Sequence, residues 1–374
     1  MLRYAPANPR IEGINDWRKR SADPVHVLMI HGVCFKSPRW VDDANQELAD
    51  ALGMRPGPGR KVLPIGADGG ELHVGELIGD GPPVRTFAIL WSPVTRPIRR
   101  ELCYDTTNAT RAPDTTCPAG GPHLADSRAW LNAKLKNEVM DGCLSEAVYA
   151  MGKDGIAHLG STIEQGLEIA LNGGSAVAPA DKLKLQELTQ QDAPLFVITQ
   201  SLGSKLFVDA AIALANRSCD ASINMGHALQ RTVQVFMEAN QLPILALAYD
   251  PPLDPPDCVR MKSSAPGART GLGALVRLRQ SAPPPRGAAA KDVMRFPLRV
   301  AAFTDPNDLL SYTLVPATGA SSGIVASDIV MVNDWTWLGV YENALAAHTT
   351  YGAKCRVKQV IAKGTAGLDA RCEP

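Results

Sequence analysis

The sequence predicts an α/β protein whose central sheet is mostly parallel and covered by helices on both faces. The first observation is a set of short apolar, β-branched runs bounded by turn residues, near 26–30, 85–91, 195–200, 232–237, 298–303 and 327–332. The second is that helix-like stretches separate these runs, which is typical of parallel strands buried on both sides. The third is size, because 374 residues that are 45% hydrophobic can bury a substantial core.

The N-terminal part of the chain predicts a strand and a helix after an irregular start. Residues 1–24 are polar and are expected to form an irregular extension. Val25–Ile30 is the first convincing core strand, and a helix follows near Asp42–Leu52 with its charges on one face. Residues 53–82 are rich in glycine, with a turn at Ala67–Gly70.

Two long stretches interrupt the alternation of strands and helices. Residues 118–175 are mostly helical and exceed the single helix that a parallel crossover needs, so they form either a cap or a packed helix pair. Residues 251–297 hold nine prolines and predict an irregular loop, either a substrate-side flap or a disordered insertion. The expected organisation is one catalytic domain over 25–351 with these insertions, followed by a tail at 352–374.

The segment around Ser201 predicts a strand, a sharp turn that carries the serine, and a helix. Such a nucleophile elbow lifts the serine Oγ out of the sheet and leaves helix N-terminal amides facing any developing negative charge. Gly203 fits the motif because a side chain there would collide with a strand. Thr199 departs from it, since the usual pattern has glycine two residues before the serine. An ordinary strand-to-helix turn capped by serine is the alternative.

Three further motifs resemble the α/β-hydrolase superfamily. The first strand ends in His31-Gly32, as does the strand before the oxyanion loop of that superfamily. Trp91-Ser92-Pro93 after the second strand, and Asn-Asp-x-Leu-Ser-Tyr around Asp308, are similar to a bacterial branch of it. The resemblance covers most of residues 25–351 and implies the α/β-hydrolase fold.

The resemblance also implies an oxyanion hole and the order nucleophile, acid, histidine along the chain. The amide of Val33 or Cys34, together with that of Leu202, would hold the oxyanion, whereas His31 would support the turn. Of the seven histidines, His227 and His348 are those that follow Ser201. His227 precedes the strand near 232–237, too early to follow an acid from the late strands, so His348 is the candidate base.

Two carboxylates follow the predicted strand at 298–303. Asp308 is favoured as the acid, because a few residues of turn are needed to swing a carboxylate toward the histidine. Asp305, before a proline, is expected to bond nearby turn amides instead. Glu238, at the end of an earlier strand, is the third candidate because some members of the superfamily place the acid one strand earlier.

Composition narrows the classes of function. The 38 basic and 38 acidic residues provide no electrostatic case for nucleic acid binding. No apolar run approaches the length of a transmembrane segment. No glycine fingerprint for a nucleotide and no zinc-ligand spacing follows a strand, so no cofactor and no metal are expected. The oligomeric state stays open.

Eight cysteines favour disulfides, and with them a periplasmic or secreted protein rather than a cytoplasmic one. The pairs Cys103–Cys117 and Cys355–Cys372 are expected to be local loop staples, although scattered buried thiols are the alternative. Cys34 either pairs or lines the site, and it lacks the elbow that a nucleophile needs. The opening residues lack a signal-peptide core, and a leader that had been removed would leave the same sequence.

Together these residues predict a serine hydrolase that cleaves small-molecule or lipid carboxylic esters through an acyl-enzyme, with Ser201 as nucleophile, His348 as base and Asp308 as acid. A lipase for long-chain esters is the nearest alternative, which a cap at 118–175 or a flap at 251–297 would support. A non-catalytic binding protein of the same fold is the alternative from another class of function. Thr199 leaves this alternative open, because it stands where the elbow motif usually has glycine.

Overall fold

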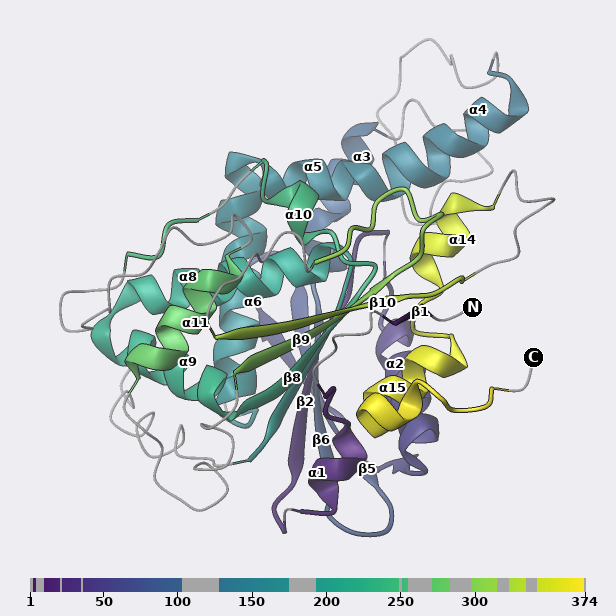
Figure 1. The fold of residues 1–374 in the computed structure, drawn as a ribbon. Coiled ribbons are helices and arrows are strands. Elements are labelled where there is room, and N and C mark those ends of the chain that lie inside the picture. The colour runs from purple at the N-terminus through teal and green to yellow at the C-terminus, as the bar shows by residue number, and fades with distance from the viewer. Residues whose placement is uncertain are drawn as a thin grey trace.

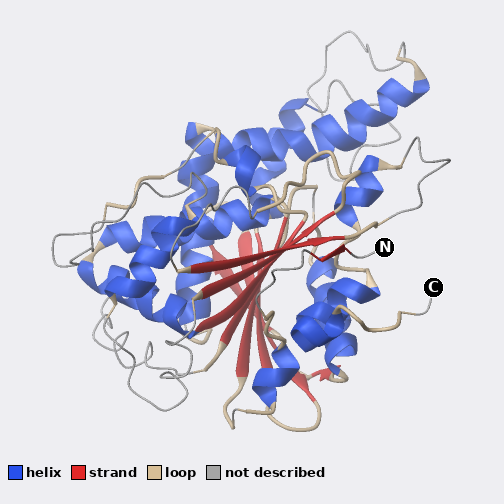
Figure 2. Cartoon of the chain, in the orientation of Figure 1, coloured by secondary structure: helices blue, strands red, loops and turns tan. Residues whose placement is uncertain are grey.

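The structure is a computed structural model and describes residues 3–4, 10–20, 22–34, 36–102, 128–174, 193–248, 251–254, 271–282, 297–314, 323–333 and 342–372. A twisted sheet runs through the middle of it, with helices on both sides (Figures 1 and 2). No helix in these ranges combines the length and the apolarity of a membrane span.

The sheet has ten strands in the order β1-β10-β9-β8-β7-β2-β6-β5-β3, with β4 paired to β5. The strands are β1 Arg3–Tyr4, β2 Val25–Ile30, β3 Arg55–Pro56, β4 Lys61–Ile65, β5 Gly70–Ile78, β6 Val84–Leu90, β7 Leu195–Gln200, β8 Thr232–Glu238, β9 Leu298–Thr304 and β10 Ile324–Val330. The run from β10 to β6 is parallel throughout, while β1, β3, β4 and β5 pair antiparallel. The mostly parallel sheet that the sequence predicts is confirmed, and all six predicted strands are in it.

The described α-helices are α1 Ile14–Arg18, α2 Arg39–Leu52, α3 Arg96–Leu102, α4 Trp130–Lys134, α5 Ser145–Met151, α6 Lys153–Leu171, α8 Leu202–Arg217, α9 Cys219–Arg231, α10 Leu242–Leu245, α11 Leu272–Ser281, α14 Ala344–Thr349 and α15 Cys355–Lys363. A π-helix, Leu135–Leu144, joins α4 to α5. Short 3-10 turns lie at Ser92–Thr95 and Gly364–Gly367.

The core has two halves, one on each face of the sheet. Along β2, Leu28 and Ile30 belong to the half covered by α6, α8, α9 and α11, whereas Val27 and Met29 belong to the half covered by α1, α2 and α15. Successive side chains of a strand point to opposite faces, so a strand covered on both sides is apolar throughout. All six residues of β2 are buried accordingly.

Two sequence-based expectations about regular structure are wrong, and the glycine-rich stretch 53–82 contains three strands that were not predicted. These are β3, β4 and β5, and the positive-φ glycines of the stretch lie in the turns around them. The extension 1–24 contains α1, and the proline-rich stretch 251–297 contains α11. The prolines of that stretch lie at its two ends, and the proline-free middle carries leucines that pack α11 against α9.

The helical stretch expected over 118–175 is helical where the structure describes it. Its last helix, α6, is a core helix whose Leu159, Ile163 and Leu167 are fully buried. Its first helix, α4, lies at the outer end of the stretch (Figure 1). The expected packed helix therefore applies to α6, while the beginning of the stretch lies outside the described residues.

Candidate active site

Ser201 occupies the sharp turn between β7 and α8. Its backbone has φ 52° and ψ −123°, in the positive-φ region that a residue with a side chain rarely adopts. The turn is anchored by the Ser201 N–H, which donates to the carbonyl of Glu238 at 2.7 Å. Strain of this kind persists only where the surrounding structure imposes it, and it concentrates at functional sites.

Two glycines allow the elbow to lie directly against the loop that follows β2. A Cβ added at Gly203 would lie 2.5 Å from the Ile30 carbonyl oxygen and 2.7 Å from that of His31. A Cβ at Gly32 would lie 2.6 Å from the Cβ of Ser201. The steric reason predicted for Gly203 is therefore confirmed, and the neighbouring strand β2 is the obstacle.

Gly203→Ala is expected to lower the free energy of unfolding by roughly 1–3 kcal/mol, because the carbonyls of β2 have to move away from the new methyl group. The matched control is Gly160→Ala in α6, where the nearest atom to an added Cβ is 3.9 Å away. That change is expected to be neutral or stabilising. Chemical denaturation of both variants measures the difference, and equal stabilities would contradict the close approach.

Thr199 takes the place of the usual glycine without leaving its hydroxyl unsatisfied. The side chain is fully buried, and its Oγ1 lies 2.8 Å from the Ser204 Oγ and donates to the carbonyl of Phe236 at 3.3 Å. The departure from the motif is thus accommodated by hydrogen bonds on the side of the sheet that α8 covers.

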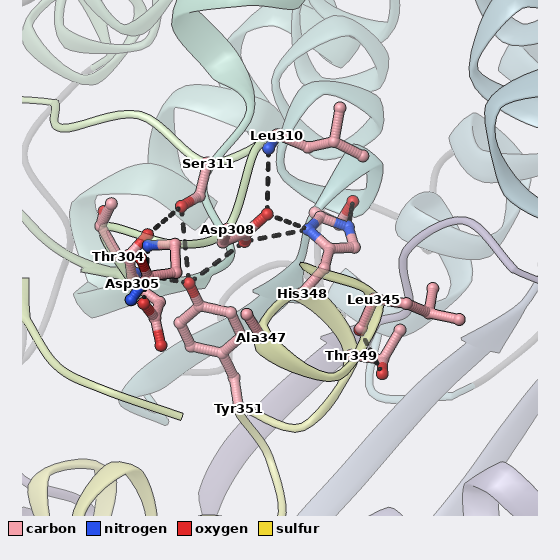
Figure 3. A network of polar contacts seen from close by, with 12 residues as sticks. Thr304, Asp305, Asp308, Leu310, Ser311, Leu345, Ala347, His348, Thr349 and Tyr351 are labelled. Carbon is pink, nitrogen blue, oxygen red and sulfur yellow. Dashed lines mark hydrogen bonds and ion pairs between the residues drawn. The ribbon is translucent and has the colours of Figure 1, made fainter. Parts of the chain in front are cut away.

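The structure brings Ser201, His348 and Asp308 together in one chain of hydrogen bonds. The Ser201 Oγ lies 2.9 Å from the His348 Nε2. The His348 Nδ1 lies 2.9 Å from each carboxylate oxygen of Asp308 (Figure 3). All three side chains are buried and come from three separate segments: the β7–α8 turn, the turn after β9, and α14.

Asp305 and Glu238, the other two candidate acids, do not contact His348. The Asp305 carboxylate accepts hydrogen bonds from the backbone N–H groups of Asn307, at 2.8 Å, and Asn333. It therefore shapes the turn, as its place before a proline predicts. Glu238 faces a cavity on the side of the sheet covered by α2 and α15.

Tyr351 is part of the network and was not expected from the sequence. Its hydroxyl donates to Asp308 Oδ2 at 3.1 Å and accepts from the Asp305 N–H at 2.6 Å, so it joins the two aspartates (Figure 3). Burial, followed by the charge of Asp308, raises the pKa of Tyr351 well above its ordinary value, and the phenol stays protonated. Tyr351 lies just beyond the end of α14, and no local pattern predicted its contacts with the two aspartates.

The segments that carry the three predicted oxyanion donors adjoin Ser201. A Cβ added at Gly32 would touch the Ser201 Cβ, so the loop that continues to Val33 and Cys34 begins beside the serine, and Leu202 is the first residue of α8. No backbone hydrogen bond from these three amides to another described residue is present. Their part as oxyanion donors stays a prediction.

His31 holds the turn rather than facing the serine. Its Nε2 accepts from the Trp91 N–H at 3.1 Å, its Nδ1 lies 2.7 Å from the Gly32 carbonyl oxygen, and its ring stacks on the Trp91 indole. Burial lowers the pKa of His31 to about 3, so the ring is neutral at physiological pH. These contacts fit the supporting part predicted for it.

Two disulfides are described. Cys355–Cys372 is confirmed as the staple of the tail. Cys34 pairs with Cys143, which joins the loop beside Ser201 to the π-helix between α4 and α5. Cys219 is disulfide-bonded as well, and Cys103 and Cys117 lie outside the described residues.

Replacing Cys34 and Cys143 together with alanine is expected to lower both stability and turnover. The bridge closes a loop of 109 residues. A loop of that length is worth about 4.7 kcal/mol in the chain-entropy model. Loss of the tether lets the oxyanion loop shift, and a displacement of about 1 Å lowers kcat about 10²-fold. Removing Cys355–Cys372 is the control, and it is expected to lower stability alone. Thermal unfolding measures the change in stability, and ester hydrolysis measures the change in kcat. An unchanged kcat without Cys34–Cys143 would contradict the idea that this disulfide positions the oxyanion loop.

Glu238 makes stability depend on pH. Burial, followed by the charge of Glu47, raises its pKa from 4.5 to about 8. Between these two values the unfolded chain loses the proton while the folded protein keeps it, so the folded state loses about 1.4 kcal/mol per pH unit. Glu238→Gln removes this dependence and is expected to gain stability relative to wild type between pH 5 and pH 8. Chemical denaturation of both proteins at pH 5 and pH 8 measures this gain. A difference in unfolding free energy that is the same at both pH values would contradict the prediction.

The chain was compared with known proteins. No family model matches it, and no curated protein matches it. Among solved structures it is similar to acetyl xylan esterase 1 from Thermoanaerobacterium sp. JW/SL YS485, with a TM-score of 0.27 and 13% identity over 88% of this chain and 71% of that one. So low a TM-score carries no argument about activity, and the geometry of the site has to support any function.

Proposed function

We propose that this protein is a serine hydrolase of the α/β-hydrolase type that cleaves carboxylic esters. The observation that supports it most is the continuous chain Ser201–His348–Asp308, with Ser201 on a strained turn at the end of a central parallel strand. Ligands of such sheets bind beyond the carboxyl ends of the strands, which is where these residues lie.

The proposed mechanism follows from the distances. His348 Nε2 removes the proton of the Ser201 hydroxyl as the oxygen attacks the acyl carbonyl, and the same nitrogen then protonates the leaving alcohol. Asp308 accepts from His348 Nδ1–H, which selects the required tautomer and stabilises the imidazolium. The amides of Leu202 and of Val33 or Cys34 hold the oxyanion. Water then cleaves the acyl-enzyme by the same steps.

Labelling with a fluorophosphonate tests the proposal directly. A single adduct on Ser201 is expected, identified by intact mass and peptide mapping, and it should be absent in His348→Ala. Absence of an adduct on folded wild-type protein would contradict an activated serine and favour the binding-protein alternative.

A lipase is the second candidate, because of one specific observation. The segment from α4 to α5 exposes large apolar side chains: Trp130, Leu131, Leu135, Met140 and Val148. An apolar surface on helices tethered to the site through Cys34–Cys143 suits contact with a lipid aggregate. Higher turnover of emulsified triglyceride than of soluble short-chain esters would support the lipase. The disulfides favour a periplasmic or secreted location within this proposal.

A further inference from the structure

A cavity of about 240 Å³ lies on the opposite side of β7 and β8 from α8. Its walls come from the ends of β2, β7 and β8, from α2 and α15, and from the turn after α14. One part is apolar, with Met29, Ile198, Trp40 and Leu48, and another carries Lys36, Glu47, Glu238 and Lys358. Ser201, Asp308 and His348 do not line it, although Gln200 and Thr349 next to them do, so the cavity adjoins the candidate active site without containing it.

Glu238 faces this cavity. The residue is 6% exposed, and no hydrogen bond joins its carboxyl group to another described residue. The carboxyl oxygens are not among the buried polar atoms that lack a partner, so they are open to the cavity. A nearly buried carboxyl group that opens into a cavity beside an apolar wall is suited to orienting a polar ligand there.

A second carboxyl group converges on the same point. A Cβ added at Gly352 would lie 3.4 Å from Glu47 Oε2 and 3.5 Å from Glu238 Oε2. Glu47, whose side chain is 36% exposed, is paired with Lys358 at 3.8 Å, and the charge of Glu47 disfavours ionisation of the neighbouring, buried Glu238. Glu238 consequently keeps its proton, in agreement with its pKa of about 8, and can donate a hydrogen bond into the cavity.

Once the paired side chains are set aside, the charge that remains at the cavity is positive. Glu47 and Lys358 neutralise each other, and Asp43 at the rim is paired with Arg39. Lys36 lines the cavity, and no ion pair joins its side chain to a described residue. Burial lowers the pKa of Lys36, while the carboxyl groups of Glu146, Glu238 and Glu47 favour its charged form. One ammonium and one protonated carboxyl group therefore point into the same space, beside an apolar wall. Two donors with one positive charge match the two oxygens of a carboxylate.

We propose that this cavity binds a small monocarboxylate with an apolar tail. Lys36 and Glu238 hold the carboxylate, and the tail packs against Trp40 and Ile198. The site is independent of the proposed hydrolysis. Ester cleavage would release a carboxylic acid, so the ligand of this cavity could be a product of the enzyme; this connection rests on the proposed function.

Calorimetric titration of the full-length protein with benzoate tests the site. Benzoate is expected to bind at least tenfold more tightly than benzamide, which has the same ring but no charge. Lys36→Met and Gly352→Ala are each expected to weaken binding about tenfold or more, the second by placing a methyl group between the two carboxyl groups. Lys61→Met removes the same charge from an exposed position and is expected to change nothing. Thermal unfolding confirms that each variant is folded.

The pH dependence distinguishes Glu238 from a nonspecific positive site. Between pH 6.5 and pH 9.0 wild-type affinity is expected to fall about tenfold, since a carboxyl group with a pKa of about 8 is then mostly ionised and repels benzoate. Glu238→Gln keeps a neutral donor and has no carboxyl group to ionise, so it should show a smaller fall, and the fall that remains measures the loss of the Lys36 charge.

Two results would overturn the proposal. One is the absence of benzoate binding to wild-type protein at pH 6.5. The other is binding that Lys36→Met and Gly352→Ala leave unchanged, which would place benzoate elsewhere, for instance at Ser201. No ester is present in these titrations, so a lack of esterase activity would not alter their outcome, and failure of this site would not count against the hydrolase.

Discussion

Asp308→Asn is expected to lower kcat for ester hydrolysis about 10⁴-fold while the protein stays folded. Both carboxylate oxygens of Asp308 lie 2.9 Å from His348 Nδ1, and one of them also accepts from the Tyr351 hydroxyl. An amide would offer a donor where the ring needs an acceptor, so the imidazole would take the wrong tautomer and its cation would lose its counter-charge. Steady-state kinetics with a p-nitrophenyl ester measure the loss of kcat, and circular dichroism shows whether the variant is folded.

Asp305→Asn is the matched control for this prediction. The Asp305 carboxylate accepts from two backbone N–H groups and does not reach His348. An asparagine there keeps one acceptor, so the variant is expected to be less stable but to retain kcat within about tenfold. Near-normal turnover of Asp308→Asn together with an inactive Asp305→Asn would reverse the assignment of the acid.

Ser201→Ala is expected to have a still larger effect and to lower kcat about 10⁶-fold, because no nucleophile remains to form the acyl-enzyme. Ser201→Ala combined with His348→Ala should be no slower than Ser201→Ala alone. Residues that act as one unit lose the whole of their effect when either is removed. Single-turnover and steady-state kinetics on the three variants test both statements.

Ser204→Ala is the control for the serine. Ser204 is also buried in the first turn of α8, and its hydroxyl pairs with Thr199 rather than with His348. Its loss is expected to change kcat less than about tenfold. Retention of activity in Ser201→Ala, or an additive further loss in the double variant, would contradict the triad.

Much of the sheet and the turn at Ser201 were predictable because their signals are local, whereas His348 was chosen through the chain order that the resemblance to α/β-hydrolases implies. Parallel strands buried on both faces are continuous apolar runs, as in β2 and β8, and such runs are visible without knowledge of their neighbours. The order of Ser201, Asp308 and His348 after successive strands places them at one edge, because parallel strands end on the same side. Whether they catalyse a reaction stays a prediction.

Other features depend on contacts between segments far apart in the chain. The pairing of Cys34 with Cys143 and the bridge that Tyr351 forms between Asp305 and Asp308 join residues that no spacing rule connects. The hairpin strands β4 and β5 were missed because glycines in turns resemble glycines in irregular loops.

By itself the sequence determined the class of fold, the parallel strands and the turn that carries Ser201, since periodicity and turn chemistry are properties of short segments. The resemblance to α/β-hydrolases favoured Asp308 and His348 through their order along the chain. The tertiary structure alone decided that Asp308 rather than Asp305 or Glu238 reaches His348, and that Glu238 and Lys36 line the same cavity. Which acid meets the histidine depends on how the β9 turn and α14 pack. The state of a buried carboxyl group depends on charges brought to it by other elements.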